Sequence, residues 1–174
     1  MVVKDPHKLK PLYRFLSKIN RRRPRNLQPK AVKSVENIWK GIDCLSCANC
    51  CRSMTPTYTP VDVKRIAGHL KISTDEMKDR WLKKERGTGN WLNKTTPCQF
   101  LDLKTNLCGV YEVRPGDCAN FPHLDKKRFS DYIHIHKQNI DECPATFKMI
   151  ERMIELVDQD QKAWRPGLEK DVLY

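Results

Sequence analysis

The 174-residue sequence lacks long hydrophobic runs and any apolar leader at its start. No stretch approaches the ~20 apolar residues that a transmembrane helix needs. Residues 1–6 read MVVKDP and lack the hydrophobic core of a secretory signal. We therefore expect a cytoplasmic protein without a transmembrane segment. Thiols stay reduced in the cytoplasm, so we expect the cysteines of this protein to be metal ligands or redox groups and not to form disulfides.

The common catalytic motifs are also missing. We find no glycine-rich phosphate loop, no nucleophile elbow, no paired-carboxylate motif and no internal repeat. The segment Gly87-Thr88-Gly89-Asn90 has the composition of a turn and not of a nucleotide site. These absences disfavour nucleotide-dependent enzymes and serine hydrolases, and they leave open whether the protein is an enzyme.

Acidic residues are scarce in the first part of the chain. Residues 1–40 contain twelve Lys or Arg against two acids, a net charge of +10, whereas the whole chain carries +12. The basic part contains no cysteine. We predict three regions: a basic helical extension over 1–40, a cysteine-cluster metal-binding domain over 41–158, and a C-terminal tail over 159–174.

Apolar stripes at helical spacing run through the basic segment. A first helix is predicted to begin at Pro11 and to end near Arg21, since Pro suits the first helical turn. A second is predicted from Pro29 to Gly41. Their buried faces are expected to be Leu12, Phe15, Leu16 and Ile19 in the first, and Val32, Val35, Ile38 and Trp39 in the second.

Helix caps and turn residues predict the remaining elements. Thr59-Pro60 and the Ser73/Glu76 capping box each begin a helix, the second running to about Arg86. Residues 98–111 suggest a small hairpin, residues 130–137 alternate like a strand, and Pro144 opens a last long helix. The fold class expected is α+β: a small, mostly helical single domain with a short hairpin, organised around a cysteine-ligated metal site.

Eight cysteines are far more than packing requires. Four of them fall within residues 44–51, and thiols with two residues between them can converge on one ion at the ~2.3 Å of a Zn–S bond. A Cys-x2-Cys-x2-Cys run also presents three corners of an iron–sulfur cluster in ferredoxins. Eight thiols allow two centres. One possible partition has Cys44, Cys47, Cys50 and Cys143 in one centre and Cys51, Cys98, Cys108 and Cys118 in the other, although Cys50 and Cys51 could exchange roles.

Four separated motifs occur in a recognisable order. They are CxxCxxCC at 44–51, PCQFLD at 97–102, CGVYEVRP at 108–115, and Cys118 followed by Phe121-Pro122. Over roughly residues 41–150 the chain resembles the CxxCxxCC cysteine-cluster family, also called YkgJ-like and described as zinc- or iron-chelating. It is also similar to the cysteine-rich part of flagellin lysine N-methylases. The basic residues 1–40 lie outside this resemblance.

The resemblance implies a bacterial cytoplasmic protein with an iron–sulfur centre. The cofactor we expect is a 4Fe-4S cluster, and zinc is the alternative. The resemblance places seven cysteines in the family's cluster, and Cys143 fits a later, less fixed position. The leading hypothesis is an iron–sulfur protein with a redox or substrate-modifying role, an oxidoreductase or methylase-like protein. A zinc-binding interaction or chelation module without catalysis is the first alternative.

Other polar residues offer weaker candidates. His134 and His136 would share one face of the predicted strand. His123, near Cys118, could be a ligand or could donate a hydrogen bond to one, and Arg114 could either tune the site or pair with Asp117 or Glu112. The partner is expected to be an unknown protein or small molecule. A second alternative is a nucleic-acid-associated zinc protein that uses residues 1–40.

Overall fold

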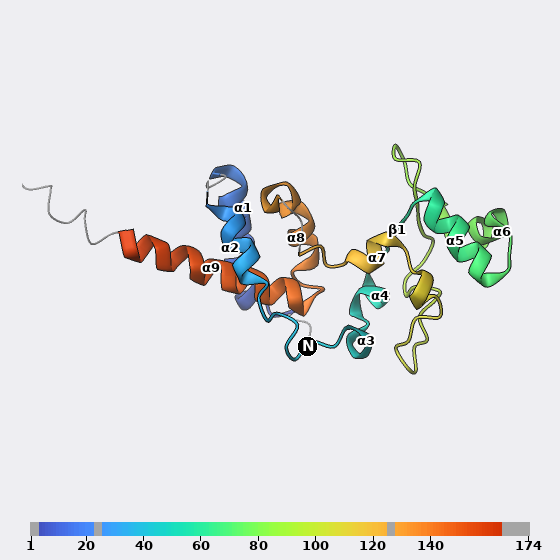
Figure 1. Cartoon of the computed structure of the whole chain (residues 1–174), viewed down its shortest axis with the longest axis horizontal. Coiled ribbons are helices and arrows are strands. Elements are labelled where there is room, and N and C mark those ends of the chain that lie inside the picture. Colours follow the sequence, from blue (N-terminus) through green and yellow to red (C-terminus); the bar gives the residue numbers. More distant parts are fainter. Residues whose placement is uncertain (1–3, 23–25, 125–127, 165–174) are drawn as a thin grey trace, which may run out of the picture. The chain divides into compact units, whose positions relative to one another are not determined.

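The computed structural model describes residues 4–22, 26–124 and 128–164, with side chains up to residue 159 (Figure 1). The chain divides into two compact units, Met1–Ile42 with Leu124–Tyr174, and Asp43–His123. It is mostly helical with one small antiparallel sheet, which confirms the α+β class. The predicted domain boundaries at residues 40 and 158 stay a prediction. Among the described residues, no helix combines the length and the apolar character that a membrane span requires.

The first unit begins with α1, Pro6–Arg22. This helix starts one turn earlier than predicted because Asp5 caps it: the Asp5 carboxylate accepts the His7 N–H at 2.9 Å, and Pro6 takes the first helical position. Pro11 consequently lies inside the helix. Of the predicted stripe, Leu12, Leu16 and Ile19 are buried and Phe15 is only half-buried, while Leu9 joins the buried face because the helix begins earlier.

The second helix, α2, is Leu27–Ser34, shorter and earlier than predicted. Its buried face consists of Leu27, Ala31 and Ser34, while Val32 and Trp39 are exposed. The predicted face is therefore wrong at Val32 and Trp39, whereas Ile38 is buried beyond the end of α2 and Val35 is half-buried. The helix contacts the last helix of the chain, and its own buried row starts at Leu27, two residues before Pro29.

The remainder of the first unit is η2, Phe129–Tyr132, α8, Ile133–Asn139, and α9, Pro144–Trp164. The strand predicted over 130–137 is therefore wrong. Ile133, His136 and Ile140 are buried at helical spacing, and His136 stacks on Phe129 with ring centroids 4.6 Å apart. His134 is exposed, so the two histidines do not share a face. Pro144 does open the last helix, whose buried side chains include Phe147, Met149, Ile150, Met153 and Leu156.

The second unit carries seven of the eight cysteines. Its helices are α3, Cys44–Cys47, α4, Asn49–Ser53, α5, Pro60–Leu70, α6, Thr74–Trp81, η1, Tyr111–Val113, and α7, Gly116–Asn120. Both predicted caps are present: Thr59 and Ser73 accept the backbone N–H groups of Asp62 and Glu76.

A three-stranded sheet lies in the same unit, with β1, Thr57–Tyr58, β2, Leu82–Lys84, and β3, Trp91–Asn93, in the order β1-β3-β2. The helix α6 ends at Trp81 and not near Arg86, because the following residues pair as a strand with β3 across a turn in which Gly87 and Gly89 have positive φ. The hairpin expected over 98–111 is reduced to one Leu101–Cys108 bridge. The core of the unit is Tyr58, Val63, Ile66, Ala67, Met77, Leu82 and Val110.

Candidate metal centre

The first cysteine cluster is built by two short helices and the turn between them. Asp43 caps α3 by accepting the Leu45 N–H at 3.0 Å. Ala48 has a left-handed backbone with φ 43°, and its N–H donates to the Cys44 carbonyl at 3.0 Å. This turn ends α3 and starts α4, so Cys44 and Cys47 come from one helix and Cys50 and Cys51 from the next.

Backbone contacts bring distant cysteine segments to this cluster. The Cys98 N–H donates to the Cys51 carbonyl at 2.8 Å. Cys108 lies opposite Leu101 in the isolated bridge, and Cys118 lies in α7. None of the eight cysteines forms a disulfide.

Four thiols lie close enough together for the charge of one to shift the pKa of another: Cys51, Cys98, Cys108 and Cys118. Burial raises the pKa values of Cys98, Cys108 and Cys118, and repulsion from the other thiols of the group raises them further. Cys51 differs, because a hydrogen bond from the Cys50 thiol lowers its pKa to about 7 against the effect of burial. We call these four residues the thiol group. They are the set that one of the two predicted centres contains, and their ligand role stays a prediction.

The thiol group is gathered but not yet in ligand geometry. Within the described ranges, no three His, Cys, Asp or Glu side chains are placed so that they could hold a metal ion. A bound cation would offset the mutual repulsion that opposes ionisation of these thiols.

Hydrogen-bond donors surround Cys98. The Phe100 N–H and the Tyr58 hydroxyl both donate to its sulfur, and the Asn93 amide lies beside it. Gln99 orients the two side chains, since it donates to Tyr58 and, from Nε2, to Asn93 Oδ1 at 3.1 Å. A thiolate bound to a metal carries negative charge and accepts such donors, which orient the ligand and tune the metal.

Asn93 offers a test of whether this site fits a metal-bound thiolate. Its side chain is fully buried, at 0% exposure, and its Nδ2 has no hydrogen-bond partner among the described residues. A buried amide donor without an acceptor costs free energy. A sulfur that carries full negative charge, as in a metal thiolate, would supply the missing acceptor, so the donor set fits a metal held by Cys98.

Two further contacts concern Cys108. The Val110 N–H donates to its sulfur, and the positive charge of Arg114 favours its thiolate, although burial outweighs both. The Arg114 guanidinium lies 4.0 Å from the centroid of the Tyr111 ring and donates to the Tyr111 carbonyl at 2.7 Å. Arg114 therefore lies in the electrostatic range of a predicted ligand. Within the part of the chain that the structure describes, it forms no ion pair with Asp117 or Glu112.

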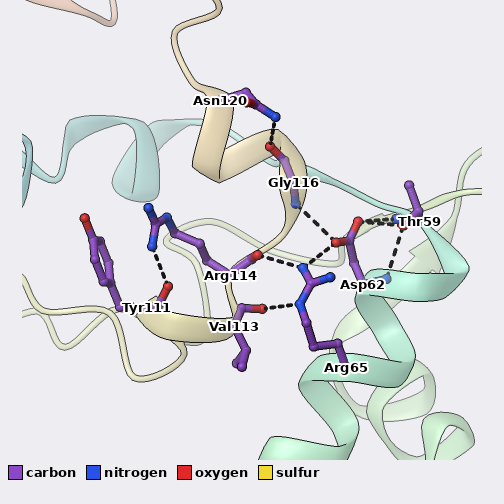
Figure 2. Close-up of polar contacts among 8 residues, drawn as sticks. All are labelled: Thr59, Asp62, Arg65, Tyr111, Val113, Arg114, Gly116 and Asn120. Carbon is purple, nitrogen blue, oxygen red and sulfur yellow. Dashed lines mark hydrogen bonds and ion pairs between the residues drawn. The ribbon is translucent and has the colours of Figure 1, made fainter.

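A buried carboxylate holds the loop that leads to Cys118 (Figure 2). Asp62 on α5 accepts hydrogen bonds from Thr59, from Arg65 Nη2 at 2.6 Å and from the Gly116 N–H at 3.2 Å. The Arg65 guanidinium in turn donates to the carbonyls of Val113 and Arg114. Burial opposes the ionisation of Asp62, but these hydrogen bonds outweigh it and lower its pKa. We call Asp62 and Arg65 the loop clamp.

His123 is oriented by the residue that precedes Cys118. Its Nε2 lies 3.1 Å from Asp117 Oδ1, and Asp117 Oδ2 accepts the Thr57 N–H at 2.9 Å. Burial opposes the ionisation of Asp117, yet the contacts with His123 and Thr57 outweigh it and lower its pKa. His123 Nδ1 is buried without a hydrogen-bond partner among the described residues, so its role near Cys118 stays a prediction.

Cys143 belongs to the first unit. It is buried directly before Pro144, and its N–H donates to the Asn139 carbonyl at 2.8 Å. Its place among the ligands, like those of Cys44, Cys47 and Cys50, stays a prediction.

Five residues at this site were missed by the sequence reading: Tyr58, Asp62, Arg65, Asn93 and Gln99. Gln99 could have been found as the neighbour of Cys98, and Asp62 as the third residue of the helix that Thr59 caps. No sequence motif near Asn93 indicates a role at the site. Asn93 lies beside Cys98 only because its strand, β3, pairs between β1 and β2.

A family model described as "putative zinc- or iron-chelating domain", with the signature CxxCxxCC, matches residues 43–144. The chain therefore belongs to this family. It is also similar to uncharacterized protein MJ0661 of Methanocaldococcus jannaschii, with 40% identity over 81 residues, 46% of this chain and 43% of that protein. The chain thus aligns with less than half the length of this relative. No solved structure matches the chain.

Removing the Tyr58 hydroxyl is expected to weaken metal binding. Tyr58→Phe keeps the buried ring and deletes one donor to Cys98, and Asn93→Leu deletes the amide donor at similar volume. Each is expected to lower the metal affinity about 10- to 100-fold, the usual effect of losing a residue that supports a ligand. Titration against a chromophoric chelator under reducing conditions measures this. Tyr111→Phe, at a 41% exposed tyrosine, is the matched control and should leave the affinity unchanged.

Proposed function

We propose that residues 43–123 bind metal through the thiol group and that the bound group is an iron–sulfur centre with a redox role. The observation that carries the proposal is the convergence of Cys51, Cys98, Cys108 and Cys118 from separate segments into one electrostatically coupled group. All-thiolate sites suit iron–sulfur clusters and zinc and do not suit magnesium or calcium.

The surroundings of the thiol group support a site with tuned redox properties. Hydrogen bonds to cluster sulfurs and partial burial both set the reduction potential of an iron–sulfur centre. Here Tyr58, Phe100 and Val110 supply donors, Asn93 lies in reach, and Arg114 adds a positive charge. A bound cluster would supply one-electron transfer. The protein's part would be to hold the four sulfurs, shield them from water and stabilise their negative charge.

Cys44, Cys47 and Cys50 are the proposed ligands of a second centre. They lie in α3 and α4 next to Cys51, and the family match includes them. In this proposal the cysteines act as ligands and not as nucleophiles.

A zinc module without catalysis is the second candidate. Zinc takes four thiolates in a closed tetrahedral site and carries no redox chemistry. The four members of the thiol group and the absence of a recognisable catalytic motif suit this candidate equally well.

Metal analysis after purification without oxygen separates the two candidates. We expect a brown protein that contains iron and acid-labile sulfide, and Cys118→Ser is expected to lose at least half of both. A colourless protein with zinc in stoichiometric amount would replace the iron–sulfur proposal by the zinc module. A protein that contains neither metal, and binds neither when reduced and reconstituted, would contradict both. Oxygen must be excluded because exposed clusters decay and zinc can then occupy their ligands.

A further inference from the structure

The helix α1 presents a face of positive charge that the metal site does not explain. Its seventeen residues contain six Lys or Arg and no acid. A groove runs along one side of the helix, and five of these cations line it. We call these residues the cationic row: Lys10, Arg14, Lys18, Arg21 and Arg22.

The face opposite the cationic row is buried in the first unit. Leu9, Leu12, Leu16 and Ile19 lie about half a turn around the helix from the row, and each is at most 8% exposed. The helix packs against α8 and α9 within that unit. An amphipathic helix that binds a bilayer must insert its apolar face, and here that face is occupied. The arrangement therefore disfavours a lipid surface as the partner.

The cations of the row have no ion-pair partner among the described residues. In the described part of the chain none of its five members forms an ion pair, whereas Lys4 pairs with Glu142 and Lys8 lies beside Glu151. Glu142 and Glu151 thus meet cations outside the row. A third acid, Asp141, accepts a hydrogen bond from the hydroxyl of Tyr13, which lines the groove.

We propose that the cationic row binds the phosphate backbone of a nucleic acid without reading its sequence. Residues four apart on a helix rise ~6 Å, so the row extends over roughly 18 Å. A duplex presents one phosphate charge per ~1.7 Å of its axis. A line of phosphates can therefore contact several cations of the row at once, whereas a single small anion can contact only one or two. Among the described residues that line the groove there is neither an amide side chain to pair with adenine nor a tryptophan to stack on a base, so the proposal rests on phosphate contacts of the five cations alone.

Salt dependence provides the test. The full chain, in one defined metal state, is titrated against a fluorescent 20-base-pair duplex of mixed sequence between 50 and 200 mM salt. If five phosphates are neutralised, log K should fall with log salt at a slope of about −4 to −5. In K10Q/R14Q/K18Q/R22Q the slope should fall in magnitude by about 3 to 4, since each phosphate contact contributes roughly one. Arg21 is kept so that a cation remains at the C-terminal end of α1.

The matched control removes the same charge from the second unit. K64Q/K83Q/K84Q/K104Q changes four exposed lysines and should keep the wild-type slope. Equal losses in both quadruple variants would show that net charge alone acts and would overturn the proposal, as would no wild-type binding at 50 mM salt. Tighter binding to phosphatidylserine vesicles than to the duplex would assign the row to lipid instead. Circular dichroism checks that each variant keeps its helices.

Discussion

Metal removal is expected to open the cysteine-bearing segments while part of the second unit stays folded. The Cys98 N–H bonded to Cys51, and the Gly109 N–H bonded to Phe100, should exchange with solvent about 100-fold faster or more. That factor corresponds to roughly 3 kcal/mol, at 1.4 kcal/mol per tenfold change. The reason is that the thiol group loses its common anchor and its buried sulfurs repel one another as they ionise.

The core beside these segments should respond much less. Tyr58, Val63, Ile66, Met77 and Leu82 pack against one another and need no metal to do so. Hydrogen exchange read by mass spectrometry, with and without a chelator under reducing conditions, compares α5 with residues 98–118. Peptides of α9 in the first unit serve as the internal control. Unchanged exchange at 98–118 after complete metal removal would contradict this prediction.

Asp62→Ala is expected to lower the free energy of unfolding by about 2–4 kcal/mol. The substitution leaves the Gly116 N–H and one face of Arg65 without their acceptor and removes part of the cap of α5. Losing a cap costs ~1 kcal/mol, and each buried donor left unsatisfied costs about 1–3 kcal/mol, less where Arg65 reaches water. Because the loop clamp also positions Cys118, metal affinity should fall as well.

The control is an ion pair of the same spacing on the next helix. Asp75 and Lys78 on α6 are also three residues apart, at 2.9 Å, but the Asp75 side chain is 83% exposed. Asp75→Ala should therefore change the unfolding free energy by less than ~1 kcal/mol. Urea unfolding of both variants in the same metal state makes the comparison, and equal effects would mean that the loop clamp has no special role.

The loop clamp also predicts the direction of acid sensitivity. Folding lowers the pKa of Asp62, so the unfolded chain takes up the proton more readily. The stability from this group is present above its unfolded pKa of ~3.9 and is lost as the pH falls through the folded value. Asp62→Asn should unfold more easily at neutral pH, and its deficit relative to the wild type should shrink below about pH 4.

Much of the helical framework could be predicted because its signals are local. Thr59-Pro60, Ser73 and Pro144 each begin a helix where the sequence indicated, since a cap needs only the residues within one turn. The wrong predictions concern segments whose local sequence suits both a strand and a helix, so that tertiary packing decides which one forms. Residues 130–137 have an alternating pattern, yet Ile133 and His136 bury as a helix against their neighbours.

The same distinction applies to the metal site. The order of four sequence motifs by itself indicated the family, and the resemblance implied the candidate ligands, because motif order is a property of the chain. Only the tertiary structure placed Cys51, Cys98, Cys108 and Cys118 together and surrounded Cys98 with Tyr58 and Asn93. Those contacts join residues far apart in sequence. They depend on strand pairing and on the hydrogen bonds from the loop clamp to residues 113–116, and no local pattern of residues encodes these contacts.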